Sequence, residues 1–176
     1  MSSHTIPSDL DAMARRVIDG NHYMTLGTSD RNCRCRLSPV YYTCARYSHF
    51  YWVSSPRAQH SRNIEQRPVV NMVIFDSTAP VGAAEAVYIA AAAVQVPEDQ
   101  LEAVAPEAFR TTAGATTLTY DDLRRAWLTP DDLRRSDLAL YVAHMQSCDV
   151  HVPGSHPVHG RGIDRRQPAD PTSPAA

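Results

Sequence analysis

The stretch FYWVSSPRAQHSRNI, residues 50–64, joins a strand to a helix. Its aromatic and β-branched start predicts a strand over 49–54. The prolines predict a helix between them, because Pro56 suits a first helical turn and Pro68 closes the helix. A strand that leads into a helix start presents backbone N–H groups and a partial positive charge, which together favour an anion. The stretch therefore predicts a binding corner as well as two elements of the fold.

Strand-like runs lie on both sides of this corner and are rich in β-branched or aromatic residues. A hairpin-turn composition joins the first two runs, and no βαβ rhythm is present. Helical spacing is found over 8–19 and again over 98–135, before the last run. We therefore expect a mainly β fold, a small antiparallel β-barrel with flanking helices. The other predicted strands cover 22–28, 35–43, 69–75, 86–96 and 138–152.

The length of 176 residues suits one domain, which we place at residues 1–153. Within the helical stretch, Thr119 and Thr129 are each positioned to cap a short helix. After Pro153 the chain is rich in Pro, His, Arg, Asp and Gly, a composition that buries little apolar surface. Residues 154–176 are therefore expected to form a disordered tail.

Composition excludes several classes of protein. A net charge of -2 argues against a nucleic-acid binder, which would carry a strong basic excess. No apolar run reaches the roughly 18 residues of a membrane span, and the N-terminus lacks the pattern of a secretory signal. The four cysteines are interpreted as reduced thiols of a cytoplasmic protein. We expect Cys33 and Cys35 to be small core thiols, and we expect no metal site.

Arginine, histidine and hydroxyl side chains gather at the corner. Arginine offers bidentate donors for phosphate, and the helix start adds backbone donors. These residue types predict a phosphate site, although an ordinary solvated helix with a serine cap would carry them too. The residues concerned are Ser54, Ser55, Arg57, His60, Ser61 and Arg62.

The segment RLSPVYYT, residues 36–43, has a proline inside an apparent strand. Pro39 cannot donate a hydrogen bond to a ladder, so it predicts an edge strand or a local distortion. Backbone groups at such an edge are free to meet a ligand. An edge strand without any ligand is the plainer alternative.

Five segments, in their order and spacing, resemble the pyridoxamine 5′-phosphate oxidase-like family, the FMN-binding split barrels. The similarity covers residues 22–96 and weakens after residue 97. It implies a six-stranded antiparallel split β-barrel, and a homodimer with two flavin sites at its interface. The segments are MTLGTSD (24–30), RLSPVYY (36–42), FYWVSSPRAQHSRNI (50–64), RPVVNMVIFDSTAPVG (67–82) and VYIAAAAV (87–94).

The resemblance also implies the cofactor contacts. Ser54 and Ser55 would face the ribityl chain and the phosphate. Arg62 would be the main phosphate contact, with Arg57, His60 and Ser61 on the same side. No catalytic acid or base is identified. The residues implied to lie along the flavin ring are Arg36, Leu37, Ser38, Pro39 and Val40.

Two stretches depart from the family pattern. Ala83–Ala86 stand where relatives have glycine-containing acidic sequence, and alanine restricts the backbone more than glycine does. The stretch 147–151 lacks an aromatic residue that relatives often place near a histidine. We therefore expect either the substrate or the cofactor to differ from that of close relatives.

These features predict an FMN-dependent oxidoreductase that acts on a small organic substrate. One alternative is a reductase on the same fold that uses a deazaflavin coenzyme of the factor-420 type. The absence of lysine among the 17 basic residues hints at the GC-rich lineages in which that coenzyme is common. The other alternative is a non-catalytic flavin- or haem-binding protein.

Overall fold

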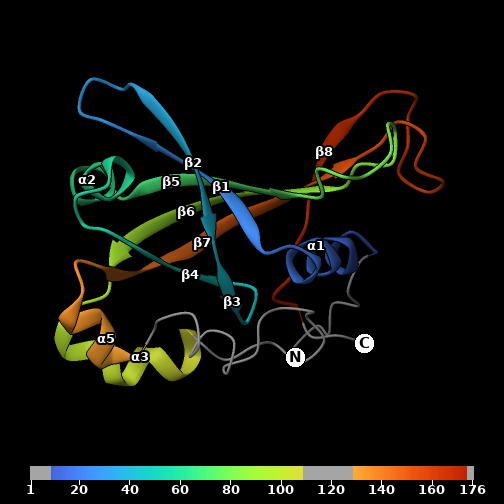
Figure 1. Ribbon diagram of the computed structural model, residues 1–176. Coiled ribbons are helices and arrows are strands. Elements are labelled where there is room, and N and C mark those ends of the chain that lie inside the picture. The colour runs from blue at the N-terminus through green and yellow to red at the C-terminus, as the bar shows by residue number, and fades with distance from the viewer. Residues whose placement is uncertain (1–8, 109–128, 174–176) are drawn as a thin grey trace, which may run out of the picture.

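The computed structural model describes residues 9–108 and 129–173. Eight strands form one antiparallel sheet in the order β2-β1-β5-β6-β7-β4-β3, and β8 pairs with β7 beside this path. Figure 1 shows a strongly twisted sheet with α1 below its right half, α2 at its left end, and α3 and α5 at the lower left. The strands are β1 (Tyr23–Ser29), β2 (Cys35–Tyr41), β3 (Thr43–Ala45), β4 (His49–Ser54), β5 (Val69–Phe75), β6 (Ala86–Gln95), β7 (Ala139–Val152) and β8 (Arg165–Pro168). The helices are α1 (Asp9–Gly20), α2 (Gln59–Gln66), the 3-10 turn η1 (Glu98–Gln100), α3 (Leu101–Ala108) and α5 (Pro130–Arg135).

The main core lies between the sheet and α1. Alternate residues of β1 and β5 point inward, and Met24, Leu26 and Met72 are each at most 2% exposed. Burying a side chain of this size stabilises the fold by roughly 1.5–3 kcal/mol. The phenol of Tyr42 donates a hydrogen bond of 2.6 Å to the carbonyl oxygen of Ile18, which holds the end of α1 against the barrel. The helical period over 8–19 thus corresponds to α1, one residue further along the chain.

A second core lies on the other face of β4 and β7, under η1, α3 and α5. Leu140 of β7 is buried there with Leu101 of α3. α5 begins with the predicted cap, because Thr129 and Asp132 form a capping box. The predicted cap at Thr119 lies outside the described residues. No helix within 9–108 or 129–173 is long and apolar enough to cross a bilayer.

The split-barrel fold is confirmed, but the sheet has more strands than the six expected. The predicted strand over 35–43 breaks at Tyr42, whose N–H bonds to the carbonyl oxygen of His22 at 3.1 Å. β3 then starts at Thr43 and pairs with β4 instead. Neighbouring chain segments, β2 and β3, therefore form the two ends of the sheet order, so the sheet curls back on itself and leaves a split. Pro39 lies on the edge strand β2, as predicted.

The expectation of a disordered tail over 154–176 is wrong for the residues that the structure describes, up to 173. β4 pairs with β7 only as far as His144, so the far half of β7 has an open edge. β8 fills this edge, with Gln167 opposite Val150. Backbone hydrogen bonds to an open edge need no apolar residues, which is why the composition of the tail did not reveal the strand.

Residues 165–173, which we call the C-terminal strap, continue from β8 onto α1. The N–H of Asp170 donates to Oδ1 of Asp11 at 2.7 Å, and Nε of Arg15 donates to the carbonyl oxygen of Pro171 at 2.9 Å. Pro171 is buried in this contact. The strap therefore ties β7 to the first helix of the chain.

The expectation that Cys33 and Cys35 are core thiols is also wrong, because both are exposed. Cys33 lies in the turn before β2 with a left-handed φ of 60°, outside any strand. Cys44 is half-buried and Cys148 is buried.

Candidate functional site

The corner between β4 and α2 is a tight turn. The N–H of Ala58 bonds to the carbonyl oxygen of Ser55 at 2.9 Å, and Oγ of Ser55 accepts the N–H of Arg57 at 3.2 Å. This turn delays the start of α2 to Gln59, later than the first turn predicted at Pro56. Ala58 occupies the N-cap with extended backbone and no side-chain hydrogen bond. The helix start is thus available to an external acceptor.

We call three side chains the corner site: Ser54 and His60, which contact each other, and Arg36 of β2, whose charge acts on His60. Oγ of Ser54 and Nε2 of His60 are 2.7 Å apart and share a hydrogen bond. Burial lowers the pKa of His60, and the positive charge of Arg36 on β2 lowers it further. In the free site both effects therefore favour the neutral imidazole over the imidazolium. A bound anion would offset both effects and favour the imidazolium.

Arg57 and Arg62, expected on the phosphate side, have other partners in the structure. The guanidinium of Arg57 donates to Oδ2 of Asp137 at 2.6 Å, and this contact lowers the pKa of Asp137. Arg62 donates to Oε1 of Gln59 at 3.0 Å and to the carbonyl oxygen of Arg57. Both arginines are exposed, so these contacts are open to exchange with solvent or a ligand.

Ser61 lies on the buried face of α2, where it is 3% exposed. It adjoins the phenol of Tyr141, whose pKa burial raises and Ser61 lowers in part. Asn63, on the same face, donates a hydrogen bond of 3.0 Å to Oγ1 of Thr28. The structure therefore places Ser61 beneath the helix, where Asn63 holds α2 to β1.

The five predicted residues of β2 divide between two faces, because side chains alternate along a strand. Arg36, Ser38 and Val40 share one face, and Val40 is buried in the core. Leu37 and Pro39 are exposed on the other face. Only part of this segment can therefore line the corner site within one subunit.

The outer face of β2 borders a groove of about 570 Å³ between β1, β5 and the end of α2. Leu37 and Val69 form its apolar walls, while Arg67 and Asn71 add polar groups. Gly27 lies in the groove, and a Cβ atom there would come within 3.2 Å of the backbone oxygen of Asn71. This volume suits a small organic ligand.

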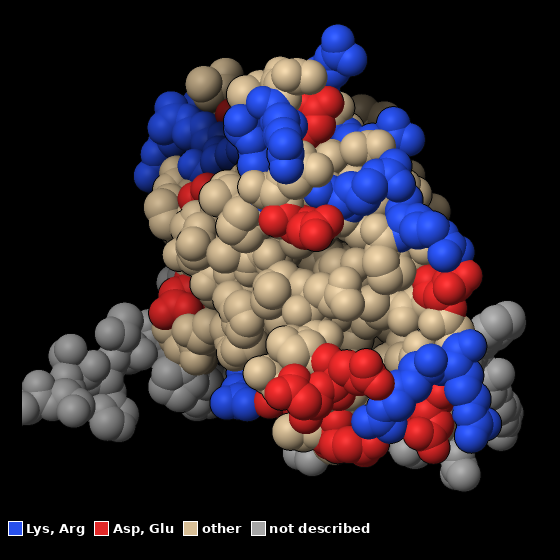
Figure 2. Space-filling view, turned by 90° about the vertical axis from the view of Figure 1, so that its left-hand side faces the viewer, with Lys and Arg blue, Asp and Glu red and all other residues tan. Residues whose placement is uncertain are grey.

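Charged side chains are unevenly distributed on one face of the molecule. Figure 2 shows basic side chains across its upper part and acidic side chains gathered towards its lower edge. Several exposed arginines lie on the β1–β2 hairpin and on or just after α2, and several exposed acids lie on η1, α3 and α5, where Arg134 and Arg135 are exposed too. The basic group consists of Arg31, Arg34, Arg36, Arg62 and Arg67, and the acidic group includes Glu98, Glu102, Asp131 and Asp132.

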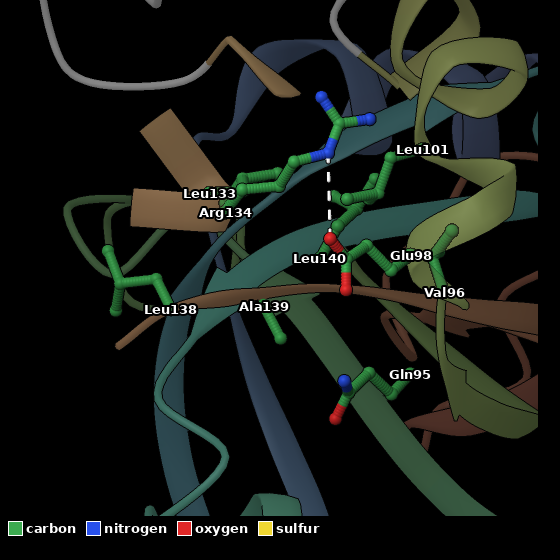
Figure 3. Close-up of a pocket in the computed structure, with 9 residues that line it drawn as sticks. All are labelled: Gln95, Val96, Glu98, Leu101, Leu133, Arg134, Leu138, Ala139 and Leu140. Atoms are coloured by element: carbon green, nitrogen blue, oxygen red, sulfur yellow. Dashed lines mark ion pairs between the residues drawn. The ribbon is translucent and has the colours of Figure 1, made fainter. Parts of the chain in front are cut away.

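A second, smaller hollow of about 170 Å³ lies between the start of β7 and the helices α3 and α5. Figure 3 shows Arg134 at its rim, paired with Glu98. Arg134 also pairs with Glu102 and Asp131, both at 3.0 Å, so its charge is already matched by three carboxylates. This hollow is therefore a less favourable binding site for an anion than the corner site is. Within the described ranges, no group of three His, Cys, Asp or Glu side chains is placed to hold a metal ion.

The sequence profile described as pyridoxamine 5′-phosphate oxidase matches residues 10–134. The chain belongs to the pyridoxamine 5′-phosphate oxidase-like family. The matched range contains all three residues of the corner site and every predicted cofactor contact. No curated protein sequence matches the chain.

Solved structures agree with this family fold at low sequence identity. A haem-binding protein from Mycobacterium smegmatis has a TM-score of 0.66 at 18% identity, and the match covers 97% of this chain and 62% of that protein. The haem storage protein of Vibrio cholerae has a TM-score of 0.58 at 17% identity, with 85% of this chain and 99% of that one covered. An FAD-binding protein from Mesorhizobium loti has a TM-score of 0.58 at 13% identity, with 79% and 91% covered. Identities this low show the fold alone.

Sequence reasoning missed three residues of this pyridoxamine 5′-phosphate oxidase-like chain that bear on the site. Asp137 holds Arg57, and Arg67 and Asn71 line the groove. Arg67 follows α2 directly in an arginine-rich stretch, which is a signal that was present in the sequence. Asp137 lies 80 residues from its partner, and no local pattern connects the two.

Proposed function

We propose that this protein binds FMN at the corner site and uses it as an oxidoreductase of the cytoplasm, acting on a small organic substrate. The observation that supports the proposal most is the contact of Ser54 with His60 at a helix start without a side-chain cap, where the charge of Arg36 also acts on His60. Such a start, with a guanidinium and a hydroxyl beside it, has the chemistry of a phosphate site.

The donor set fits a phosphorylated flavin. Arg36 and the first N–H groups of α2 would hold the phosphate, and Ser54 would donate to it or to the ribityl chain. Leu37 and Pro39 on the outer face offer apolar contact for the ring of a site shared with a second subunit. A bound flavin supplies hydride transfer, while the residues of this chain bind and orient it.

A homodimer completes this proposal. The outer face of the sheet exposes large apolar side chains, with Tyr23 62%, Leu37 72% and Val69 63% exposed. Apolar surface of this kind next to a groove is typical of an interface. A dimer mass in light scattering at micromolar concentration is the expected result, and a monomer mass would contradict this part of the proposal.

A haem-binding protein without catalysis is the second candidate, because two of the similar solved structures are described as haem-binding or haem storage proteins. A deazaflavin coenzyme at the same corner is the third, since it also carries a phosphate for Arg36 to bind. Both alternatives use the same fold and differ in the bound chromophore.

The absorption spectrum of the purified protein, before and after incubation with FMN, tests the proposal. Flavin bands near 375 and 450 nm that stay with the protein through gel filtration are expected. A single band near 420 nm would instead indicate a deazaflavin, and a sharp Soret band would indicate haem. Absence of retained FMN would contradict the proposed function.

A further inference from the structure

Two exposed cysteines lie close together on the β1–β2 hairpin. The N–H of Cys33 bonds to the carbonyl oxygen of Asp30 at 3.0 Å, which fixes the turn. Sγ of Cys35 lies 4.0 Å from the carbonyl oxygen of Cys33. The thiol of Cys35 is therefore next to the backbone of Cys33, and both thiols are accessible from solvent.

Arg67 contacts the first of these thiols. Its Nη1 lies 3.5 Å from Sγ of Cys33, and its Nη2 donates to the carbonyl oxygen of Arg31 at 3.2 Å. The second contact anchors the guanidinium at the hairpin. The guanidinium therefore lies directly beside the Cys33 sulfur, where its positive charge attracts an anionic reagent.

The surroundings of the pair are strongly basic. Exposed arginines occupy positions 31, 34 and 36 around the two cysteines, and Arg67 lies across from them. Asp30 is the acid of the hairpin, and its carboxylate accepts the N–H groups of Asn32 and Arg34. Basic surface of this kind attracts small anions and raises their rate of encounter.

The other two cysteines of the chain have the opposite character. Burial raises the pKa of Cys148 to about 12 and raises the pKa of Cys44 as well. Neither forms a useful amount of thiolate near neutral pH. The chain therefore contains its own comparison between an accessible basic pair and two protected thiols.

We propose that Cys33 and Cys35 form a redox site that reacts with anionic low-molecular-weight disulfides of the glutathione class. In the first step the Cys33 thiolate attacks the disulfide, a mixed disulfide forms, and one thiolate of the reagent leaves. In the second step Cys35 loses its proton and attacks the Cys33 sulfur, and the second reagent thiolate leaves. The two cysteines are oxidised to one disulfide, and the reagent is reduced to two thiols. This reaction uses no flavin, although Cys35 and Arg67 also line the groove beside β2.

Intact-mass spectrometry of the reduced full-length protein, treated with glutathione disulfide, tests the site. The wild type is expected to lose two hydrogen atoms and to yield a peptide with Cys33 linked to Cys35. The Cys35→Ser variant is expected to stop as a stable glutathione adduct on Cys33. The Cys33→Ser variant is expected to form no internal disulfide and to react more slowly. Adducts on Cys44 or Cys148 at the wild-type rate, or no internal disulfide in the folded wild type, would overturn the proposal.

The role of Arg67 in the reaction is tested separately. Arg67→Gln is expected to slow the reaction with glutathione disulfide roughly three- to tenfold at low salt. The reaction with a neutral disulfide, such as hydroxyethyl disulfide, should be slowed less. Arg161→Gln, which removes an exposed arginine of the β7–β8 loop, is the matched control and should react as the wild type does. Equal rates for Arg67→Gln and Arg161→Gln with the anionic reagent would refute the claim that the charge of Arg67 speeds this reaction.

Discussion

The C-terminal strap and the corner site both bring charged residues together, but they use the charges differently. In the strap, Arg15 and Asp11 bind backbone groups of the chain itself. In the corner site, the charge of Arg36 lowers the pKa of His60, and the helix start has no side-chain cap. Charges that are satisfied inside the chain stabilise the fold, whereas charges left near one another are available to a ligand. The predictions below test this difference.

The largest effect is expected from removing the strap. Truncation after Pro153 exposes the edge of β7, removes the buried Pro171 from α1 and removes the Asp170 N–H that donates to the buried carboxylate of Asp11. We expect the free energy of unfolding to fall by about 3–5 kcal/mol, which lowers Tm by roughly 6–20 °C. Thermal unfolding followed by circular dichroism measures this. Truncation after Ser173 is the control, and an equal Tm for both truncations would show that the strap does not dock.

A smaller loss of stability is expected from Arg15→Ala. This change removes the hydrogen bonds from Arg15 to the carbonyl oxygens of Pro171 and Ser173. We expect the free energy of unfolding, measured by urea denaturation, to fall by about 1–2 kcal/mol. The affinity for FMN should not change. Arg16→Ala, whose side chain pairs with Glu85 on the surface, serves as the neighbouring control. If both variants unfold at the same urea concentration, the strap contact contributes nothing.

His60→Gln is expected to remove a pH dependence of FMN binding. In the free protein, burial and Arg36 hold the pKa of His60 below 6.5, and a bound phosphate would raise it. Binding would then take up a proton, so the affinity advantage of the wild type over His60→Gln grows as pH falls from 8 towards 6. The phosphate itself gains a proton near about pH 6, but this weakens both proteins alike. A ratio of dissociation constants that is constant with pH would disprove a role for His60.

The smallest effect is expected at the pair of Arg57 and Asp137, which are 72% and 75% exposed. Exposed pairs are screened by water and salt. Asp137→Asn should leave Tm within about one degree of the wild type. It should, however, free Arg57 and strengthen FMN binding slightly at low salt. A clear fall in Tm would mean that the pair belongs with the strap contacts and not with the corner.

Local sequence patterns predicted the parts of the fold that depend on near neighbours. β4 and β5 have the predicted bounds, and the cap at Thr129 forms because its partner lies three residues away. The strap was missed because its partners on α1 are about 150 residues distant and are polar. Cys33 was misplaced because it lies in a turn with positive φ, outside the strand and away from the core.

The corner site shows the same difference between features set by neighbours in the sequence and features set by distant residues. Residue types at the corner predicted phosphate chemistry, and the structure brings Ser54 and His60 together as neighbours along that stretch. The sequence favoured Arg62 as the main contact, since it lies within the same stretch. The structure adds Arg36 from a separate strand, while Arg62 bonds within its own helix. Which arginine binds the phosphate depends on tertiary contacts that no local pattern contains.

The most direct test of the account is a titration of the flavin-free protein with FMN and with riboflavin, at matched salt, for the wild type, Arg36→Ala and Arg161→Ala. Arg36→Ala is expected to weaken FMN binding roughly ten- to a hundredfold, because a charge-assisted hydrogen bond to phosphate is lost. Riboflavin binding should be nearly the same in all three proteins, and Arg161→Ala should bind FMN as the wild type does. Unchanged FMN affinity in Arg36→Ala, or an equal loss for riboflavin, would contradict a phosphate site at this corner.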